Sequence, residues 1–206
     1  MKRALEWGGL AAGAVMILFG LVTIFMSFDG QNTVKDSLKK EYIVGSADMT
    51  PAAIREEAKA AGLNLSKIDL PTQSVAGKSI NSGSRARVFA QYMRIHTFES
   101  TGGETYSQMG RYLTPSGKDT NDAAAAAKDP KTGQPEANGK RDIWVTETAL
   151  TTALNMSYMA QQLTLFSLVI GIALLLSGFG FIILALVAIG GVRLPERSRK
   201  ATVAVA

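Results

Sequence analysis

The side chains that most often perform chemistry are sparse in this chain. His96 is the only histidine, and there is no cysteine. One imidazole without thiolates cannot supply a multi-histidine or thiolate metal site, and disulfides and cysteine nucleophiles are excluded. His96 is one possible base for a serine nucleophile, but the chain contains no Gly-x-Ser-x-Gly elbow. We therefore expect no catalytic, cofactor-binding or metal-binding residues, and we interpret His96 as a packed or hydrogen-bonded structural residue on the apolar face of a helix.

Two further patterns are weaker still as signs of a site. The segment Gly77-Lys78-Ser79 matches only the end of a phosphate-binding loop, because the full pattern requires a glycine where this chain has Thr72. We interpret the acidic pair Glu56/Glu57 as part of a solvated helix face. We interpret the pair Asp119/Asp122 as part of a loop.

Two long apolar runs organise the chain. Residues 7–28 and 163–192 contain no charged side chain, and each exceeds or matches the roughly 20 residues that a helix needs to cross a bilayer. The first run ends at Phe28-Asp29 without a small-residue cleavage site, so we predict an uncleaved signal anchor. Neither run carries an ionisable residue, which disfavours a channel or transporter acting alone.

Basic residues flank both runs and predict the topology. Lys2 and Arg3 precede the first run, and the segment 193–200 after the second is rich in arginine and lysine. Both termini are therefore predicted in the cytoplasm and the middle of the chain outside the plasma membrane. The net charge of +5 resides mainly at these ends. Because the middle segment is nearly balanced, we expect no nucleic-acid partner.

Small residues recur along both apolar runs. Such residues let helix backbones approach closely in lipid, so we predict packing between the two spans or against a partner helix. The alternative is that glycine is simply frequent in membrane helices. The candidate packing residues are Gly9, Gly13, Gly20, Ser167, Gly171 and Gly178.

The middle segment contains several helix signals. Thr50-Pro51 predicts the start of a helix that covers 52–60, and the apolar spacing around Phe89 predicts a helix over 85–100. Residues 41–44 favour a short strand and 104–113 a further helix. The segment 116–141 is interpreted as a loop, with a short alanine helix at 123–127 as the alternative. A helix starting near Asp142, where Asp142 acts as its cap, is expected to continue into the second span.

The predicted fold class is therefore a mainly α membrane protein: an antiparallel two-helix transmembrane hairpin that carries a small, mainly helical (α or α+β) extracytoplasmic domain. Its parts are a cytoplasmic N-terminus (1–6), two transmembrane helices (7–28 and 163–192), the outer domain (29–162) and a basic cytoplasmic tail (193–206). Within the outer domain, the candidate ligand or partner surface consists of Phe89, Tyr92, His96 and Tyr106.

Three segments carry a resemblance to a known group of proteins. The stretches 87–96, 129–135 and 144–155 are similar to an uncharacterised family of small two-span membrane proteins from actinobacteria. The resemblance implies an actinobacterial plasma membrane. Some members carry the label of an aromatic ring-opening dioxygenase. Non-haem iron oxygenases typically use two histidines and a carboxylate, and His96 is alone here, so no catalytic residue is carried over.

These observations favour a non-catalytic integral membrane protein that acts as an accessory subunit or scaffold of a larger cell-envelope complex. Its expected partners are the lipid bilayer and other membrane proteins or a second copy of itself. The alternative is a membrane-tethered sensor or ligand-binding domain outside the membrane. An extracytoplasmic hydrolase is a third, less favoured hypothesis.

Overall fold

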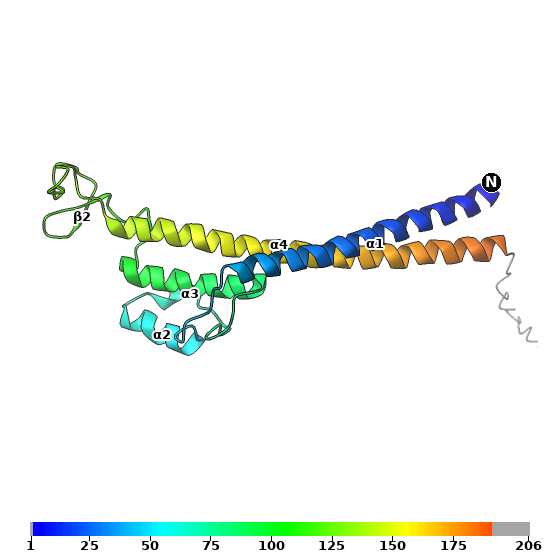
Figure 1. Ribbon diagram of the computed structural model, residues 1–206, viewed down its shortest axis with the longest axis horizontal. Coiled ribbons are helices and arrows are strands. Elements are labelled where there is room, and N and C mark those ends of the chain that lie inside the picture. The colour runs from blue at the N-terminus through cyan, green and yellow to red at the C-terminus, as the bar shows by residue number, and fades with distance from the viewer. Residues whose placement is uncertain (1, 191–206) are drawn as a thin grey trace, which may run out of the picture. The chain divides into compact units, whose positions relative to one another are not determined.

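Two long helices contain the apolar runs at the two ends of the chain (Figure 1). The computed structural model describes residues 2–190. Helix α1 spans Lys2–Lys40 and helix α4 spans Gly139–Ile189. Both are long and apolar enough to span a membrane. This confirms a mainly α fold with an apolar helix at each end, whereas the basic tail at 193–206 lies outside the described residues.

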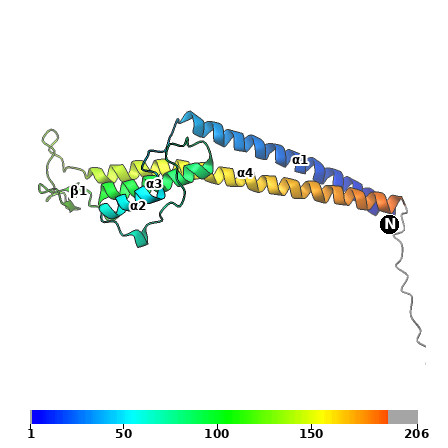
Figure 2. The same cartoon turned by 90° about the horizontal axis from the view of Figure 1, so that it is seen from below.

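The chain divides into two compact units. The first, which we call the apolar helix pair, consists of α1 up to Phe28 and α4 from Leu165 onward; the second, the central unit, covers Asp29–Thr164. Within the apolar helix pair the two helices run antiparallel, and they lie side by side in both views (Figures 1 and 2).

Glycines bring the two backbones of the apolar helix pair into close contact. A Cβ atom added to Gly13 would stand 2.7 Å from the carbonyl oxygen of Gly178, and the reverse substitution would place it 2.8 Å from the carbonyl of Gly13. Two turns along, a Cβ on Gly20 would stand 2.8 Å from the carbonyl of Gly171. Because a methyl group does not fit at these distances, the observed spacing of the helices requires glycine at these positions.

The remaining candidate packing residues lie in less tight surroundings. A Cβ on Gly9 would stand 3.2 Å from the Cβ of Ala185, which extends the contact at one end. Ser167 is half-buried on α4. Ala185 was missed in the sequence, although it follows Gly178 at the same spacing that separates Gly171 from Gly178.

Large apolar side chains cover the outward surface of the apolar helix pair. Exposing this much apolar surface to water would cost free energy, whereas exposing it to the hydrocarbon of a bilayer would not. Examples from both helices are Leu18, Phe19, Phe25, Phe166, Leu176 and Leu184.

The central unit is built from the second part of α1, the first part of α4, and two helices between them: α2 (Pro51–Ala60) and α3 (Gly83–Thr101). The predicted start of α2 is confirmed, since the Thr50 side chain accepts a hydrogen bond from the Ala53 amide at 3.2 Å. A short 3-10 helix, η1 (Leu65–Lys67), follows α2. The core comprises Leu38, Met49, Ile54, Ala58, Leu63, Val75, Ile80, Ala86, Ala90, Tyr92, Ile95 and Leu154.

The predicted helix over 85–100 is confirmed as α3, which is capped at both ends. The Ser82 side chain accepts a hydrogen bond from the Arg85 amide, and Gly102 closes the helix with a left-handed φ of 72°. At its start, a Cβ on Gly83 would stand 2.6 Å from the carbonyl oxygen of Ser157 on α4. Glycine therefore lets α3 approach the backbone of α4 closely.

The structure differs from the sequence expectations in the connecting segments. Residues 41–44 form no regular strand; Val44 makes only an isolated bridge to Ser79. The predicted helix over 104–113 is wrong, because two glycines with positive φ precede it and the chain turns into strand β1 (Tyr112–Leu113). Strand β1 pairs antiparallel with β2 (Asp119–Thr120).

The start of α4 also differs from the expectation. The helix begins at Gly139 rather than near Asp142, and it is Asn138 whose side-chain oxygen accepts a hydrogen bond from the Lys140 amide at 3.2 Å. The expected capping role of Asp142 is therefore wrong; Asp142 lies in the first turn, where its charge suits the helix dipole. Residues 123–127 form turns and not an alanine helix.

The glycine contact yields a paired test. Gly178→Ala should destabilise the apolar helix pair by about 1–3 kcal/mol, because its methyl group meets backbone atoms of α1. Gly180→Ala is the matched control, since nothing lies within 4 Å of its added Cβ, and should change stability by less than about 0.5 kcal/mol. Unfolding by SDS in mixed micelles can be followed by energy transfer between two introduced cysteines. Equal effects of the two substitutions would contradict the close contact.

Candidate functional site

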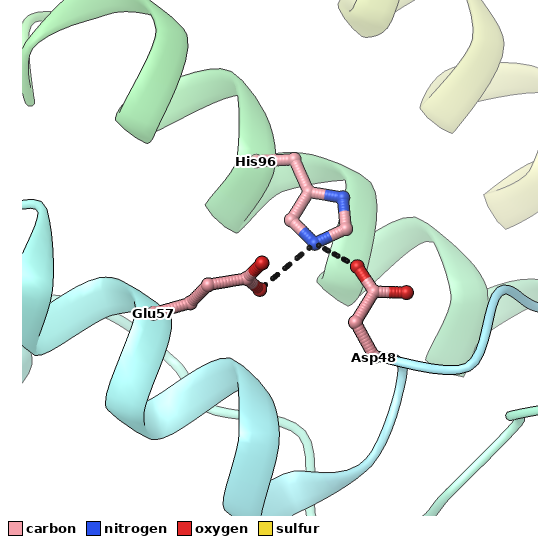
Figure 3. A group of neighbouring side chains, drawn as sticks. All are labelled: Asp48, Glu57 and His96. Atoms are coloured by element: carbon pink, nitrogen blue, oxygen red, sulfur yellow. Dashed lines mark ion pairs between the residues drawn. The ribbon is translucent and has the colours of Figure 1, made fainter.

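The only histidine of the chain lies against two carboxylates from separate segments. His96 is on α3, Glu57 is on α2, and Asp48 is in the turn that precedes α2. The Nε2 atom of His96 is 3.2 Å from Oδ2 of Asp48 and 3.4 Å from Oε2 of Glu57. Figure 3 shows both carboxylates pointing toward this one ring nitrogen. We call these three residues the His96 cluster.

The contacting atoms of the His96 cluster are more buried than the side chains that carry them. Each side chain is about a third exposed, with 31% for His96 and 39% for Glu57. Yet Nε2 of His96 and Oε2 of Glu57 are inaccessible to solvent and make no hydrogen bond of good geometry within residues 2–190. The pKa of Asp48 lies below its usual value, chiefly because Ser46 donates a hydrogen bond to it, and His96 adds to this effect.

The interpretation of the acidic pair Glu56/Glu57 as a solvated face holds for only one of the two residues. Glu56 is exposed and pairs with Lys59 at 2.8 Å, one turn along α2. Glu57 instead faces α3 and His96. Sequence reasoning missed this because the residues of the His96 cluster lie far apart along the chain. The amphipathic phase of α2, which buries Ile54 and Ala58, was the available signal.

Two hydroxyl groups on α3 near His96 are directed to the backbone. Ser100 donates to the carbonyl oxygen of His96 at 2.9 Å, and Thr97 donates to the carbonyl of Met93 at 3.0 Å. A serine or threonine nucleophile needs its hydroxyl within hydrogen-bond reach of the base. These two hydroxyls therefore lend no support to a hydrolase that uses His96.

A cleft of about 490 Å³ lies between α3 and α4 beside His96. Its walls combine polar and apolar side chains: Met93, His96, Thr97 and Ser100 from α3, and Asp142, Ile143, Thr146, Glu147 and Leu150 from α4. The most buried acidic group in this wall is Glu147, which is 4% exposed.

Glu147 is buried and forms an ion pair with one arginine. Its Oε2 atom lies 3.0 Å from Nη1 of Arg94 on α3, and the Arg94 guanidinium also covers the Trp144 ring at 4.5 Å. Burial raises the pKa of Glu147 above its usual value, and the charge of Arg94 opposes that rise. Sequence reasoning missed this pair. Its signal was an acidic residue on the same helix face as Leu150 and Leu154, where an apolar residue is expected.

A second cavity, of about 530 Å³, is mostly apolar. It lies in the central unit between α3, the part of α4 from Leu150 to Ser157, and the end of α1. Its lining consists of Ser37, Leu38, Glu41, Ile43, Phe89, Met93, Leu150, Ala153, Leu154 and Ser157.

The four residues of the predicted ligand surface do not gather at one place. Phe89 lines the apolar cavity, and His96 lines the cleft and joins the His96 cluster. Tyr92 is fully buried, and its hydroxyl donates to the carbonyl of Gln73 at 2.9 Å. Tyr106 is exposed, with its ring 3.7 Å from the guanidinium of Arg141. Phe89 and His96 therefore line two different cavities, which share Met93 and Leu150 in their walls.

Comparison with known proteins adds no relative from which a function could be read. The chain matches no family model, no curated protein and no solved structure.

The raised pKa of Glu147 predicts a pH effect with a definite sign. The folded chain holds this proton more tightly than the unfolded chain, whose reference pKa is 4.5. The stability that the group contributes is therefore present below that value and is lost as pH rises through the folded-state pKa. The side chain of the Glu147→Gln variant stays uncharged at every pH. The unfolding free energy of the variant, relative to that of wild type, should therefore increase as pH rises from 4.5 through the folded-state pKa of Glu147.

Chemical unfolding of the detergent-solubilised chain across about pH 4 to 8 measures this difference. Glu99→Gln removes an exposed carboxylate from α3 and controls for the loss of one charge. A Glu147→Gln profile parallel to that of wild type would show that the carboxyl titrates identically in both states.

Proposed function

We propose that this chain is a non-catalytic integral membrane protein and serves as an accessory subunit or scaffold of a larger cell-envelope complex. The observation that carries the proposal is the glycine contact between α1 and α4. The glycines that face each other across the two helices are used within the chain itself, and large apolar side chains are exposed on the rest of the surface. Such a helix pair suits an anchor in lipid and offers no polar path across it.

In this proposal the two helices cross the plasma membrane as an antiparallel transmembrane hairpin, and the central unit lies outside. Support comes from the basic residues at both ends, since Lys2 and Arg3 precede one apolar run and the 193–200 segment follows the other. Positively charged flanks are retained in the cytoplasm. The resemblance to actinobacterial two-span proteins agrees with this placement.

A partner would then contact the central unit rather than the glycine faces. The segment between α3 and α4 is long, polar and exposed over most of residues 114–137, and loops of that length are often engaged in function. The hydroxyls of Thr97 and Ser100 on α3 donate to backbone carbonyls, which supports a role in binding over one in catalysis.

The topology can be tested with single cysteines, because the chain has none of its own. In intact cells, a membrane-impermeant maleimide should label Ser116→Cys in the central unit. Ser198→Cys, in the basic tail, should react only after the cells are permeabilised. Labelling of the tail in intact cells, or protection of Ser116→Cys, would reject the proposed orientation.

The role as a subunit is tested by isolating the tagged full-length protein from native membranes in mild detergent and identifying what accompanies it by mass spectrometry. We expect a stoichiometric set of partners that survives a salt wash, because the contact would be an assembled interface. An unrelated tagged two-span protein from the same membranes serves as the control. If the chain is isolated alone or only with itself, the subunit proposal fails.

The apolar cavity favours a second candidate function, a membrane-tethered binding domain. A space of about 530 Å³ with mostly apolar walls lies within the usual size range of ligand sites. Under this alternative, native mass spectrometry of the same preparation should detect a small apolar molecule bound to the chain. Ala153→Phe would fill the cavity and remove that molecule.

A further inference from the structure

We propose that the His96 cluster binds one divalent transition-metal ion, with Zn²⁺ as the ion that best suits its donors. The ligands are Nε2 of His96, a carboxylate oxygen of Asp48 and a carboxylate oxygen of Glu57, which all lie within 4.8 Å of one another. This inference goes beyond the proposed function and does not depend on it, because a metal ion here would serve a subunit and a binding domain alike.

The spacing of the donors matches a tetrahedral ion. Zinc lies about 2.0–2.2 Å from imidazole nitrogen and carboxylate oxygen, so two ligands of a tetrahedral site stand about 3.3 Å apart. The distances from His96 Nε2 are 3.2 Å to Asp48 and 3.4 Å to Glu57 (Figure 3). These two edges therefore fit a zinc ion, and the third edge, between the two carboxylate oxygens, is at most 4.8 Å.

The negative charges of the His96 cluster also favour the binding of a cation. A neutral imidazole can donate one proton from Nε2, yet two carboxylates face that atom. Within the described residues neither Asp48 nor Glu57 forms an ion pair with a lysine or arginine. The two negative charges repel each other, and a divalent cation neutralises both.

Two of the three atoms that would hold the ion are left without hydrogen bonds. Nε2 of His96 and Oε2 of Glu57 are inaccessible to solvent and have no hydrogen-bond partner of good geometry in the described chain. Buried polar atoms are normally satisfied. Coordination to a metal gives both atoms a partner at once. The side chains themselves are about a third exposed, which leaves access for the ion and for a water ligand.

The donor types select among metals. Imidazole suits zinc and its transition-metal neighbours, whereas calcium and magnesium prefer oxygen ligands alone. Three protein ligands leave a fourth tetrahedral position for water. Because Asp48 precedes α2, Glu57 lies on α2 and His96 lies on α3, the ion joins α2 to α3 and stabilises the folded central unit through mass action.

The test uses the full-length protein in detergent micelles after removal of metals with a chelator. Titration calorimetry with ZnCl₂ should show one saturable equivalent, and the thermal unfolding midpoint should rise with zinc concentration. His96→Gln and Asp48→Asn should each weaken binding by at least about tenfold. The matched control is Glu56→Gln, which removes an exposed carboxylate from the same helix and should bind zinc as wild type does.

The outcomes separate a metal site from a simple ion pair. If wild type shows no saturable single equivalent, or if both variants bind zinc as tightly as wild type, the proposal is wrong and the His96 cluster is an ion pair only. Far-ultraviolet circular dichroism establishes that each variant is folded, and Asp48→Asn decides the matter if His96→Gln does not fold. Neither result alters the isolation experiment, so failure here and failure of the subunit proposal are distinguishable.

Discussion

The structure depends most on the distance between two helix backbones. Gly13 and Gly20 on α1 face Gly178 and Gly171 on α4 so closely that no side chain fits between them. In a lipid bilayer, where we propose that this pair lies, the hydrophobic effect does not drive helices together, so dispersion between well-fitted backbones must do so. Dispersion weakens within a few tenths of an ångström. A repeat of glycines at two-turn intervals is therefore the simplest way for this sequence to hold the apolar helix pair together.

The central unit is stabilised by a different force. Its apolar side chains are taken out of water, as Ile54 from α2 and Ile95 from α3 illustrate. Each fully buried side chain of this size contributes about 1.5–3 kcal/mol before the entropy of ordering is counted. One chain thus relies on close backbone contact in its apolar helix pair and on side-chain burial in its central unit. Glycine permits close backbone contact in both, as Gly83 does between α3 and α4, and in the central unit Gly102 also ends a helix.

The elements that could be predicted from sequence are those whose signals are local. A capping hydroxyl with a following proline identifies α2, and the apolar spacing around Phe89 identifies α3. Uncharged length identifies the two apolar helices. The helix expected over 104–113 failed because its apolar residues matched a helical period, while Gly102 and Gly103 before it and Gly110 within it favour turns. A Cβ on Gly110 would stand 2.5 Å from the amide of Thr120, a contact invisible in a local window.

The candidate site could not be predicted in the same way. His96 stands out in the sequence as the chain's one imidazole, but its carboxylate neighbours come from other segments and carry no spacing signature. Glu147 was hidden for a related reason: the burial of this carboxylate is offset by its partner Arg94, which lies on another helix. Pairings between elements, unlike caps and periods, exist only after the chain has folded.

Because the one imidazole of the chain lies between α2 and α3, the proton magnetic resonance signal of that side chain reports on the contact between the two helices. Its ring protons give one histidine pattern in a proton spectrum, and no assignment is needed to know which residue produces it. Because Nε2 faces α2 through Glu57 and the preceding turn through Asp48, that pattern senses whether α2 is seated on α3. The packing of α2 on α3 can thus be followed through the signal of one side chain, in a membrane preparation whose other proton signals overlap.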